Sequence, residues 1–488
     1  MTPPLPGSLT PPNGPRYRLL AEEIERQISA GALQRGDRLT SLRRRARDRG
    51  LSVGTVLEAY LLLERRGLLE ARPRSGFYVR GPGADPRYDK LPEAAAPPAA
   101  SRPLSLALEA LSGDVVSRAQ LSDLVPLGIA KLHRSLLPTA ALNRCARRAL
   151  RTYPEHGSDY DNPQVSRRLR RQIARRLALG GASVAPEELL ITNGATEALS
   201  LALRALARRG DEVVVETPTY YGLLEILAAL GLRVVEVPCC PQRGPEIAAL
   251  RRALARPAVR ALVLMPNGHN PLGYVLEEGI KGEIVALAEE RGVAIIEDDV
   301  YGELCQRPSR PRTLSSFDRH GSVLLCSSFS KLIGPGYRLG FLAPGRFGAR
   351  VAALKGLTSV SNAVLPQAIV AEYLESGQFD RFVVTVNRRV EAQLDQLRQA
   401  VVAAFPAGLR VSRPAGGCVL WLQLPAGVSG LELYRAALEE GIGILPGDIY
   451  SPSGRFGEYV RISGGNPWSD EIAAAVETLG RLCRHLRA

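Results

Sequence analysis

Lysine is scarce in this chain: five of its 488 residues are lysine, whereas 58 are arginine. No apolar run reaches the roughly 18 residues that a membrane-spanning helix needs, and residues 1–15 lack the apolar segment of a secretory signal. The seven cysteines are scattered and form no Cys-x-x-Cys pair, so neither a disulfide framework nor a metal site is expected. These absences predict a protein of the reducing cytoplasm without a membrane partner.

The positive charge is concentrated near the N-terminus. Residues 1–80 carry 15 arginines and 8 acidic residues, which gives +7, half of the net charge of +14 for the whole chain. This asymmetry favours a nucleic-acid-binding module at the N-terminus, with a solvated basic face as the alternative. The length suggests two or three domains.

Apolar spacing and turn signals outline a small N-terminal domain, residues 12–80. Gly36-Asp37 marks a turn, Thr40-Ser41 caps a second helix and Ser52 caps a third. The pattern predicts three helices and a two-stranded hairpin, at about 16–30, 42–49, 53–66, 68–71 and 76–80. This order is typical of a winged helix-turn-helix.

The same segment resembles the GntR-type winged helix. The resemblance is carried by three stretches: Gly31-x-Leu33-x-x-Gly36-Asp37-Arg38-Leu39-x-Ser41-x-Arg43, Leu51-Ser52-x-x-Thr55-Val56-x-x-Ala59-Tyr60-x-x-Leu63-x-x-x-Gly67 and Gly76-Phe77-x-Val79. Thr40 stands where the family usually has proline. The resemblance implies a double-stranded DNA operator as partner, with the third helix in the major groove.

Five positions of this domain are candidate DNA contacts. Ser52 and Thr55 lie at the start of the third helix, where polar side chains can reach base edges and phosphates, and Ser52 can cap the helix as well. Arg43 opens the second helix and could reach a base or a phosphate, while Arg38 and the wing around Gly76 would touch the DNA backbone. The remaining arginines of the second helix are interpreted as a general basic face: Arg44, Arg45, Arg47 and Arg49.

The rest of the chain predicts an α/β domain behind a linker. Residues 81–120 are expected to form the linker: residues 81–103 are rich in Pro, Ala and Gly, and a short amphipathic helix is expected near 104–118. From 121 to 488, strand and helix patterns alternate, which predicts a largely parallel sheet (about 170–360) and a smaller α+β part (about 365–488). Strands are expected at 189–192, 212–216, 233–237, 261–265, 294–297 and 322–326, with helices at 196–208, 219–230, 246–256 and 277–291 and one long helix at 368–401.

Lys331 has the surroundings of a reactive amine. It follows the apolar strand at 322–326, and a desolvated lysine can form a Schiff base with an aldehyde, which arginine cannot. Arg338 comes seven residues later, and Asp298 ends an earlier strand. An amine, an anion-binding guanidinium and a strand-end carboxylate in this order suggest a pyridoxal phosphate site.

The C-terminal part resembles the fold type I aminotransferases, with motifs in the order of that family. They are Asn193-Gly194-Ala195-Thr196-Glu197-Ala198, Thr217-Pro218-Thr219-Tyr220, His269-Asn270-Pro271-Leu272-Gly273, Asp298-x-x-Tyr301 and Ser328-x-Ser330-Lys331. The resemblance implies a Schiff base between Lys331 and pyridoxal phosphate. It implies phosphate binding by the following residues: Gly194, Ala195, Thr196, Ser328, Ser330 and Arg338.

The remaining residues of these motifs would hold the cofactor ring. Asp298 would keep the pyridine nitrogen protonated, with Asp299 as the competing assignment. Tyr301 and Asn270 would bond the 3-oxygen. Tyr220 would stack on the ring, although a core role is the alternative and neighbouring Tyr221 competes.

Two further positions extend the resemblance. Arg461, in Val460-Arg461-Ile462-Ser463, matches the arginine that clamps a substrate α-carboxylate; a surface arginine is the alternative. Tyr160 begins a segment that reaches the cofactor phosphate of a neighbouring subunit in the family. Val165 stands where the family usually has glycine, and Phe382-Val383-Val384-Thr385 replaces its usual basic stretch.

A GntR-type winged helix fused to an aminotransferase-like domain resembles the MocR-type regulators. This resemblance implies a homodimer, commonly head-to-tail, that binds DNA and senses an amino acid, an amine or pyridoxal phosphate at Lys331. An active aminotransferase with an appended DNA-binding domain is the second hypothesis, and a scaffold without cofactor is the third.

Overall fold

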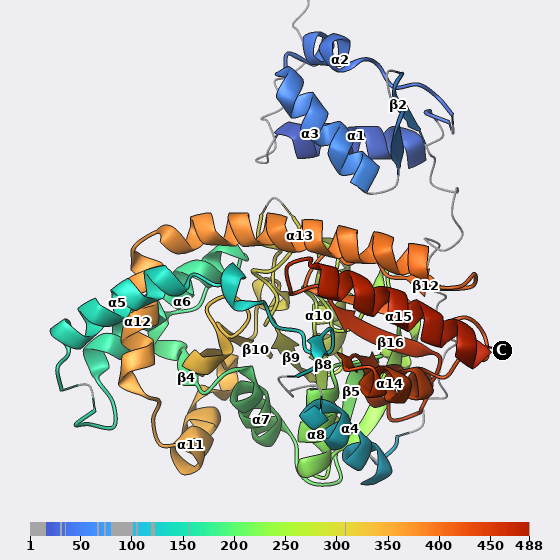
Figure 1. Ribbon diagram of the computed structural model, residues 1–488. Coiled ribbons are helices and arrows are strands. Elements are labelled where there is room, and N and C mark those ends of the chain that lie inside the picture. Colours follow the sequence, from blue (N-terminus) through green and yellow to red (C-terminus); the bar gives the residue numbers. More distant parts are fainter. Residues whose placement is uncertain are drawn as a thin grey trace, which may run out of the picture. The chain divides into compact units, whose positions relative to one another are not determined.

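The computed structural model describes residues 16–29, 32–34, 36–65, 68–72, 75–79, 101–103, 106–118, 123–155, 157–307 and 309–487. The chain divides into a small N-terminal unit and a large unit, each with its own core (Figure 1). Gly31, Gly67 and most of the expected linker, residues 81–100, lie outside the described residues.

The small unit has three helices and a hairpin, as predicted. The elements are α1 (Arg16–Ser29), α2 (Leu42–Arg49), α3 (Val53–Arg65), β1 (Leu69–Arg72) and β2 (Gly76–Val79), with the two strands antiparallel. Ile24, Tyr60 and Leu63 are buried between the elements. The Ser41 Oγ accepts a hydrogen bond from Arg44 N at 3.4 Å, and Gly50 ends α2 with φ 60°, a conformation that glycine adopts without strain.

The large unit is built on an eight-stranded mixed sheet in the order β4-β11-β10-β9-β8-β5-β6-β7. Five neighbouring strands, β10, β9, β8, β5 and β6, run parallel, which confirms the predicted parallel core. The strand β11 runs antiparallel to both of its neighbours, β4 and β10, and the edge strand β7 runs antiparallel to β6. The strands are β4 (Leu190–Thr192), β5 (Glu212–Thr217), β6 (Arg233–Cys240), β7 (Gly244–Pro245), β8 (Val259–Leu264), β9 (Ala294–Asp298), β10 (Val323–Ser328) and β11 (Gly340–Ala343).

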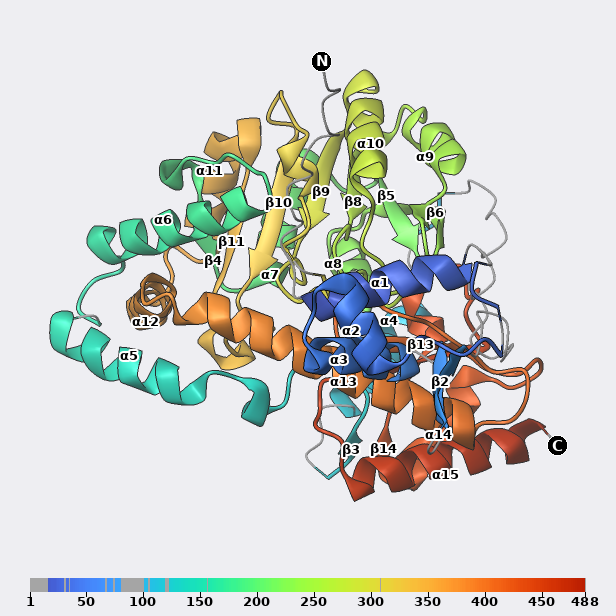
Figure 2. The same cartoon turned by 90° about the horizontal axis from the view of Figure 1, so that it is seen from above.

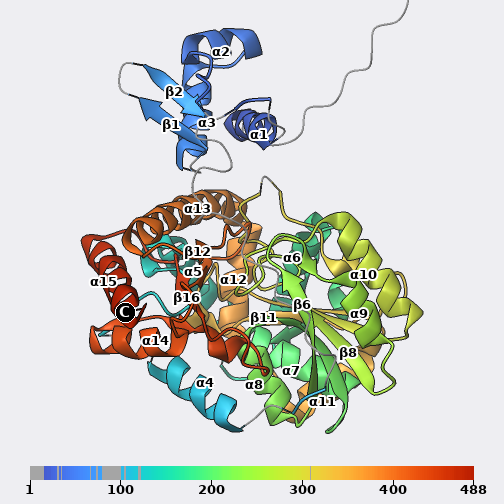
Figure 3. The same ribbon diagram turned by 90° about the vertical axis from the view of Figure 1, so that its right-hand side faces the viewer.

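Helices cover both faces of this sheet (Figure 3). Strand residues alternate between the faces, so Val213 and Val215 pack with α7, α8 and α11, whereas Val214 packs with the core that includes α9 and α10. The helices of the large unit are α4 (Leu106–Arg118), α5 (Thr139–Thr152), α6 (Pro163–Leu179), α7 (Ala195–Leu206), α8 (Tyr221–Ala229), α9 (Ile247–Leu254), α10 (Glu278–Glu290), α11 (Gly348–Thr358), α12 (Val364–Glu375), α13 (Gln378–Ala404), α14 (Gly430–Glu439) and α15 (Asp470–Arg487). The helix α4 confirms the short helix predicted near 104–118.

A second sheet forms the C-terminal part. Its antiparallel strands follow the order β12 (Arg410–Val411), β13 (Val419–Gln423), β16 (Tyr459–Ser463) and β15 (Leu445–Pro446). A separate short pair joins β3 (Val125–Pro126) to β14 (Ile442–Gly443), so the chain at residue 125 packs beside residues more than 300 positions later. Among the described residues, no helix combines the length and hydropathy that crossing a membrane requires.

The prediction of a single helix at 368–401 is wrong. Two helices, α12 and α13, occupy this stretch, and they are separated at Gly377, whose φ is 68°. Glycine adopts this left-handed conformation without a Cβ clash, so the chain changes direction there. Figure 2 shows α12 beside α5 and α6, and Arg168 on α6 pairs with Glu372 (3.1 Å) and Glu375 (2.5 Å) on α12.

Gly377→Ala should lower the thermal midpoint, because alanine pays about 1 kcal/mol for the left-handed conformation. The matched control is Gly279→Ala in α10, an exposed helical position with open space around the new Cβ. Alanine there should raise the midpoint, because its higher helix propensity stabilises the folded state by up to about 1 kcal/mol. Equal shifts of the two variants in thermal unfolding would contradict this account of the break.

Candidate functional site

Neighbouring parallel strands bring the predicted cofactor residues to one edge of the large sheet. Asp298 is the last residue of β9, and Lys331 follows the end of β10 by three residues. The two strands pair in parallel with Cys326 opposite Asp298. Asn270 lies in the loop after β8, the other neighbour of β9. The carboxyl edge of an open parallel sheet is where α/β proteins bind ligands.

Lys331 is held inside the site by a backbone contact. Its Nζ donates a hydrogen bond to the Ala130 carbonyl at 2.7 Å and lies 5.2 Å from the centre of the Tyr301 ring. Burial lowers the pKa of Lys331, because a desolvated ammonium ion is disfavoured. The shift favours the neutral amine, which is the nucleophilic form.

Asp298 is buried, with 5% of its surface exposed, and it accepts a hydrogen bond from Val300 N at 3.1 Å. Burial raises its pKa to about 7. Neighbouring Asp299 is used differently: its carboxylate accepts from Asn267 Nδ2 at 2.9 Å and pairs with Arg310 at 2.5 Å. The geometry therefore favours Asp298 over Asp299 for a cationic ring nitrogen.

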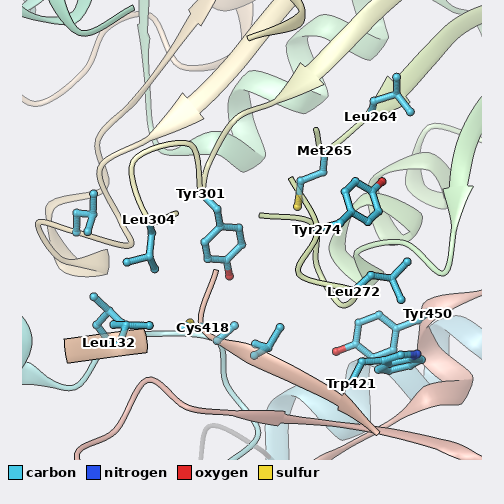
Figure 4. Close-up of a cluster of buried hydrophobic side chains, with 14 of the residues drawn as sticks. Leu132, Leu264, Met265, Leu272, Tyr274, Tyr301, Leu304, Cys418, Trp421 and Tyr450 are labelled. Atoms are coloured by element: carbon cyan, nitrogen blue, oxygen red, sulfur yellow. The ribbon is translucent and has the colours of Figure 1, made fainter. Parts of the chain in front are cut away.

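Tyr301 offers a hydrogen bond that no described residue takes up. Its side chain is 2% exposed, and the buried hydroxyl has no partner among the residues described. Figure 4 shows its ring in one buried cluster with Leu304 and Cys418. An unpaired buried hydroxyl costs about 1–3 kcal/mol, so this atom fits a ligand oxygen.

Arg461 is fully buried, which overturns the alternative of a surface arginine. It lies on β16 opposite Trp421 of β13 and is 1% exposed. Its Nη1 donates to Asn270 Oδ1 at 3.0 Å, and its Nη2 donates to the Gly128 carbonyl. The Nε has no partner among the described residues. A buried guanidinium with free donor capacity can take a ligand carboxylate.

The start of α7 has the geometry of a phosphate cradle. Gly194 precedes the helix with φ 86°, and a Cβ at this position would lie 2.8 Å from Arg338 Nη2. Arg338 Nη2 donates to the Asn193 carbonyl at 2.8 Å, so the guanidinium faces the helix start. Ala195 and Thr196 supply N–H groups in the first turn, where helices bind anions.

Ser328 is the last residue of β10, and Ser330 follows it by two residues. The Ser328 Oγ accepts from Ser330 N at 3.4 Å, and both side chains are half-buried. Tyr220 precedes α8, with its ring 4.9 Å from that of Tyr221. Both tyrosines remain candidates for stacking on a ligand ring.

Tyr160 is not brought to this cluster by its own chain. It is 80% exposed and precedes α6, whose first turn is capped by Asn162 through a 3.1 Å bond from Gln164 N. Val165, where the related proteins usually have glycine, is 1% exposed inside α6. The valine side chain thus contributes to the core rather than to a turn.

Sequence reasoning missed the backbone groups of one segment. The carbonyls of Gly128 and Ala130 accept from Arg461 and Lys331, and no side-chain pattern could have revealed them. It also missed the role of Glu197, which accepts from Asn193 N at 2.5 Å and pairs with Lys355 at 3.1 Å. This acid fixes the loop that precedes α7.

The residues of the site fit pyridoxal phosphate. Lys331 offers an amine, Asp298 a carboxylate for the ring nitrogen, and Tyr301 an unused hydroxyl. Gly194 and Arg338 form a cradle that a side chain at 194 would fill.

The candidate DNA contacts lie on the surface of the small unit. Arg43 is exposed, and Ser52 caps α3, accepting from Thr55 N at 3.0 Å. The backbone of Arg38 forms an isolated antiparallel β-bridge with Tyr78 of the wing. A Cβ on Gly76 would lie 3.7 Å from the Arg38 Nε. These positions therefore form two groups, one at the start of α3 and one at the wing.

Two arginines of the expected basic face bind side chains within the small unit. Arg45 Nε donates to the Tyr60 hydroxyl at 3.3 Å, and Arg49 pairs with Glu23. Arg44 and Arg47 are exposed.

Asp298→Asn should change how stability depends on pH in the protein without bound ligand. The folded pKa of about 7 exceeds the usual value near 3.9, so ionisation costs stability as pH rises between these values. Asparagine keeps the bond from Val300 N and cannot ionise. The difference in free energy of unfolding between the variant and wild type, measured in urea, should increase by about 2–4 kcal/mol in favour of the variant from pH 4.5 to pH 7.5.

The control for this experiment is Asp123→Asn, at an exposed position, which should leave the pH dependence unchanged. A constant difference between Asp298→Asn and wild type at both pH values would contradict the burial argument.

Comparison with known proteins identifies the families of both units. Residues 137–479 match the family model for aminotransferase class I and II, and residues 16–79 match that for bacterial regulatory proteins of the gntR family. The uncharacterized HTH-type transcriptional regulators YdcR and YjiR of Escherichia coli are 35% and 33% identical to this chain. The alignments cover 96% and 95% of it and 98% of each relative.

Enzymes are also similar to the large unit. The 2-aminoadipate transaminase of Thermus thermophilus is 31% identical over 72% of this chain and 88% of the enzyme. The crystal structure of LysN, an α-aminoadipate aminotransferase from the same organism complexed with N-(5'-phosphopyridoxyl)-L-leucine, superposes with a TM-score of 0.70. It is 29% identical and covers 79% of this chain and 99% of that chain.

These matches extend over both units and agree with the fold. The chain belongs to the pyridoxal phosphate-dependent aminotransferase class I and II family and carries an N-terminal gntR-family domain, the combination of the MocR-type regulators.

Proposed function

We propose that this protein is a sequence-specific transcription regulator whose large unit senses an amino acid, an amine or pyridoxal phosphate at Lys331. The observation that carries the proposal is the presence, in one chain, of a gntR-family domain and a buried cluster of Lys331, Asp298 and Tyr301. Relatives named as transcriptional regulators share both parts along nearly the full length. A regulator that binds DNA would act in the cytoplasm.

The residues of the large unit would divide the work of holding the cofactor. Pyridoxal phosphate, when bound, supplies an aldehyde that reacts reversibly with primary amines. The Lys331 amine would anchor it, Asp298 would hold the proton of the ring nitrogen, and Tyr301 would donate to the 3-oxygen. Ser328, Ser330, Arg338 and the start of α7 would bind the phosphate.

Arg461 would select the effector. A buried guanidinium prefers a carboxylate, which favours an α-amino acid over a simple amine. In the described structure Nη1 and Nη2 of Arg461 donate to Asn270 and to the Gly128 carbonyl, whereas Nε has no partner among the described residues. A carboxylate bound at Nη1 or Nη2 would therefore compete with these contacts. Only a ligand with different affinities for two conformations can change DNA binding. Competition at Arg461 is one source of such a difference.

A second copy of the chain would complete the site. Tyr160 is 80% exposed in the single chain, and in a homodimer, head-to-tail as in related regulators, it would reach the cofactor phosphate of the other copy. The exposure of this aromatic side chain supports the assignment.

The second candidate function is an active aminotransferase with an appended DNA-binding domain. It is favoured by the 31% identity to a transaminase and by the buried Arg461. Steady-state turnover with amino acid and 2-oxo acid pairs separates the two functions. Rates of about 1–1000 per second would indicate the enzyme.

Lys331→Ala should abolish the absorbance band of the Schiff base with the cofactor near the visible edge, because Lys331 is the amine that the described structure places in the buried site. It should also abolish any effect of amino acids on operator binding. Lys131→Ala, at an exposed lysine, is the matched control and should keep both properties. A Lys331→Ala protein that still responds to amino acids would refute sensing through this amine.

Arg43→Ala should weaken binding to the operator by about 1–3 kcal/mol if Arg43 reads a base. The operator can be obtained by selection from a random duplex library with the full-length protein. Arg26→Ala removes one charge from exposed Arg26 on α1 and should have a smaller effect. An unchanged dissociation constant for Arg43→Ala at fixed salt would rule out this role.

A further inference from the structure

Two apolar side chains are exposed on α3 of the small unit. Val53 is 45% exposed and Leu57 is 37% exposed, and they are the large hydrophobic side chains exposed in the described part of this unit. Their neighbours Val56, Tyr60 and Leu63 are almost completely buried. The core of the small unit is therefore complete without Val53 and Leu57.

The two side chains form one apolar strip. Val53 and Leu57 are four residues apart, so they lie one turn apart on the same side of the helix. Gly54 next to Val53 has no side chain, and a Cβ there would meet only Ser52 Oγ, at 3.8 Å. A partner surface can thus approach the helix closely at its first turn.

The polar groups at this helix start are largely occupied with each other. The Ser52 and Thr55 hydroxyls are 2.8 Å apart, and Ser52 Oγ also accepts from Thr55 N. Hydroxyls that cap the helix have less capacity to bond base edges. Val53 and Leu57, by contrast, have exposed side chains that a partner can cover.

The charge around the strip identifies its partner. Arg43 and Arg44 are exposed on α2, which packs against α3, and residues 1–80 carry a net charge of +7. An apolar strip on α3, together with exposed arginines on the helix that packs against it, is complementary to a polyanion that presents apolar groups. In the major groove of DNA the exposed apolar group is the 5-methyl of thymine, which distinguishes A·T from the other base pairs.

We infer that Val53 and Leu57 contact thymine 5-methyl groups in the major groove and thereby determine part of the operator sequence. The inference rests on the proposed DNA-binding function and deepens it. Ser52 and the exposed Arg44 and Arg47 of α2 position the helix on the phosphates, while Val53 and Leu57 select A·T pairs at the positions they face.

The test removes single methyl groups from the DNA. A duplex selected with the full-length protein is compared, at one salt concentration, with duplexes in which each thymine in turn is replaced by deoxyuridine. At one or more positions the loss of the methyl should weaken binding by about three- to fivefold, the value expected for one buried methyl group.

Protein variants then assign each methyl to its side chain. In Val53→Ala and Leu57→Ala, the position served by the lost side chain should become insensitive to deoxyuridine, whereas the other position keeps its sensitivity. Alanine favours the helix, so these variants should fold; circular dichroism checks this. Val384→Ala and Leu179→Ala truncate exposed side chains of the large unit and should retain every sensitivity of the wild type.

The outcomes are distinguishable. If no sequence is enriched by selection, the proposed DNA-binding function fails and the inference fails with it. If sequences are enriched but deoxyuridine changes the dissociation constant by less than twofold at every thymine, only the inference is overturned. It is also overturned if both variants keep the full sensitivity at every position.

Discussion

The parallel pairing of β9 with β10 is the constraint on which the rest of the site depends. It places Asp298 opposite Cys326, five residues before Lys331, at the edge where both strands end. The loops after β8 and β5 supply Asn270 and Tyr220 at the same edge, because these strands run parallel in the same sheet. The C-terminal sheet adds Arg461, whose Nη1 reaches Asn270 at 3.0 Å. The two sheets thus gather residues as far apart in the chain as Tyr220 and Arg461, which are separated by 241 positions.

Burial then gives the gathered residues their chemistry. Desolvation lowers the pKa of Lys331 and raises that of Asp298, so both groups favour their uncharged forms more than they would in water. The Tyr301 hydroxyl remains without a partner in the described structure, and Arg461 keeps an unused Nε. Such groups are costly unless a ligand satisfies them, which supports the proposed binding of pyridoxal phosphate at Lys331 and of a carboxylate at Arg461.

Much of this arrangement could be predicted from the sequence. Strand patterns and family motifs located the parallel core and the residues around Lys331, because buried strands and their turns leave local signals. The break at Gly377 was missed, since one glycine inside a helical pattern does not reveal the sign of its φ. The Gly128 and Ala130 carbonyls could not be found, because any residue carries such groups. The burial of Arg461 and the pairing of Arg49 with Glu23 depend on tertiary contacts that spacing does not encode.

The central claim is that occupancy of the Lys331 site and affinity for DNA are coupled. The most direct test titrates one sample of the cofactor-loaded, full-length protein with an amino acid while absorbance and operator binding are recorded together. Coupling predicts that both signals change with the same midpoint concentration. Absorbance that changes while the dissociation constant for the operator stays constant at all concentrations would contradict the account.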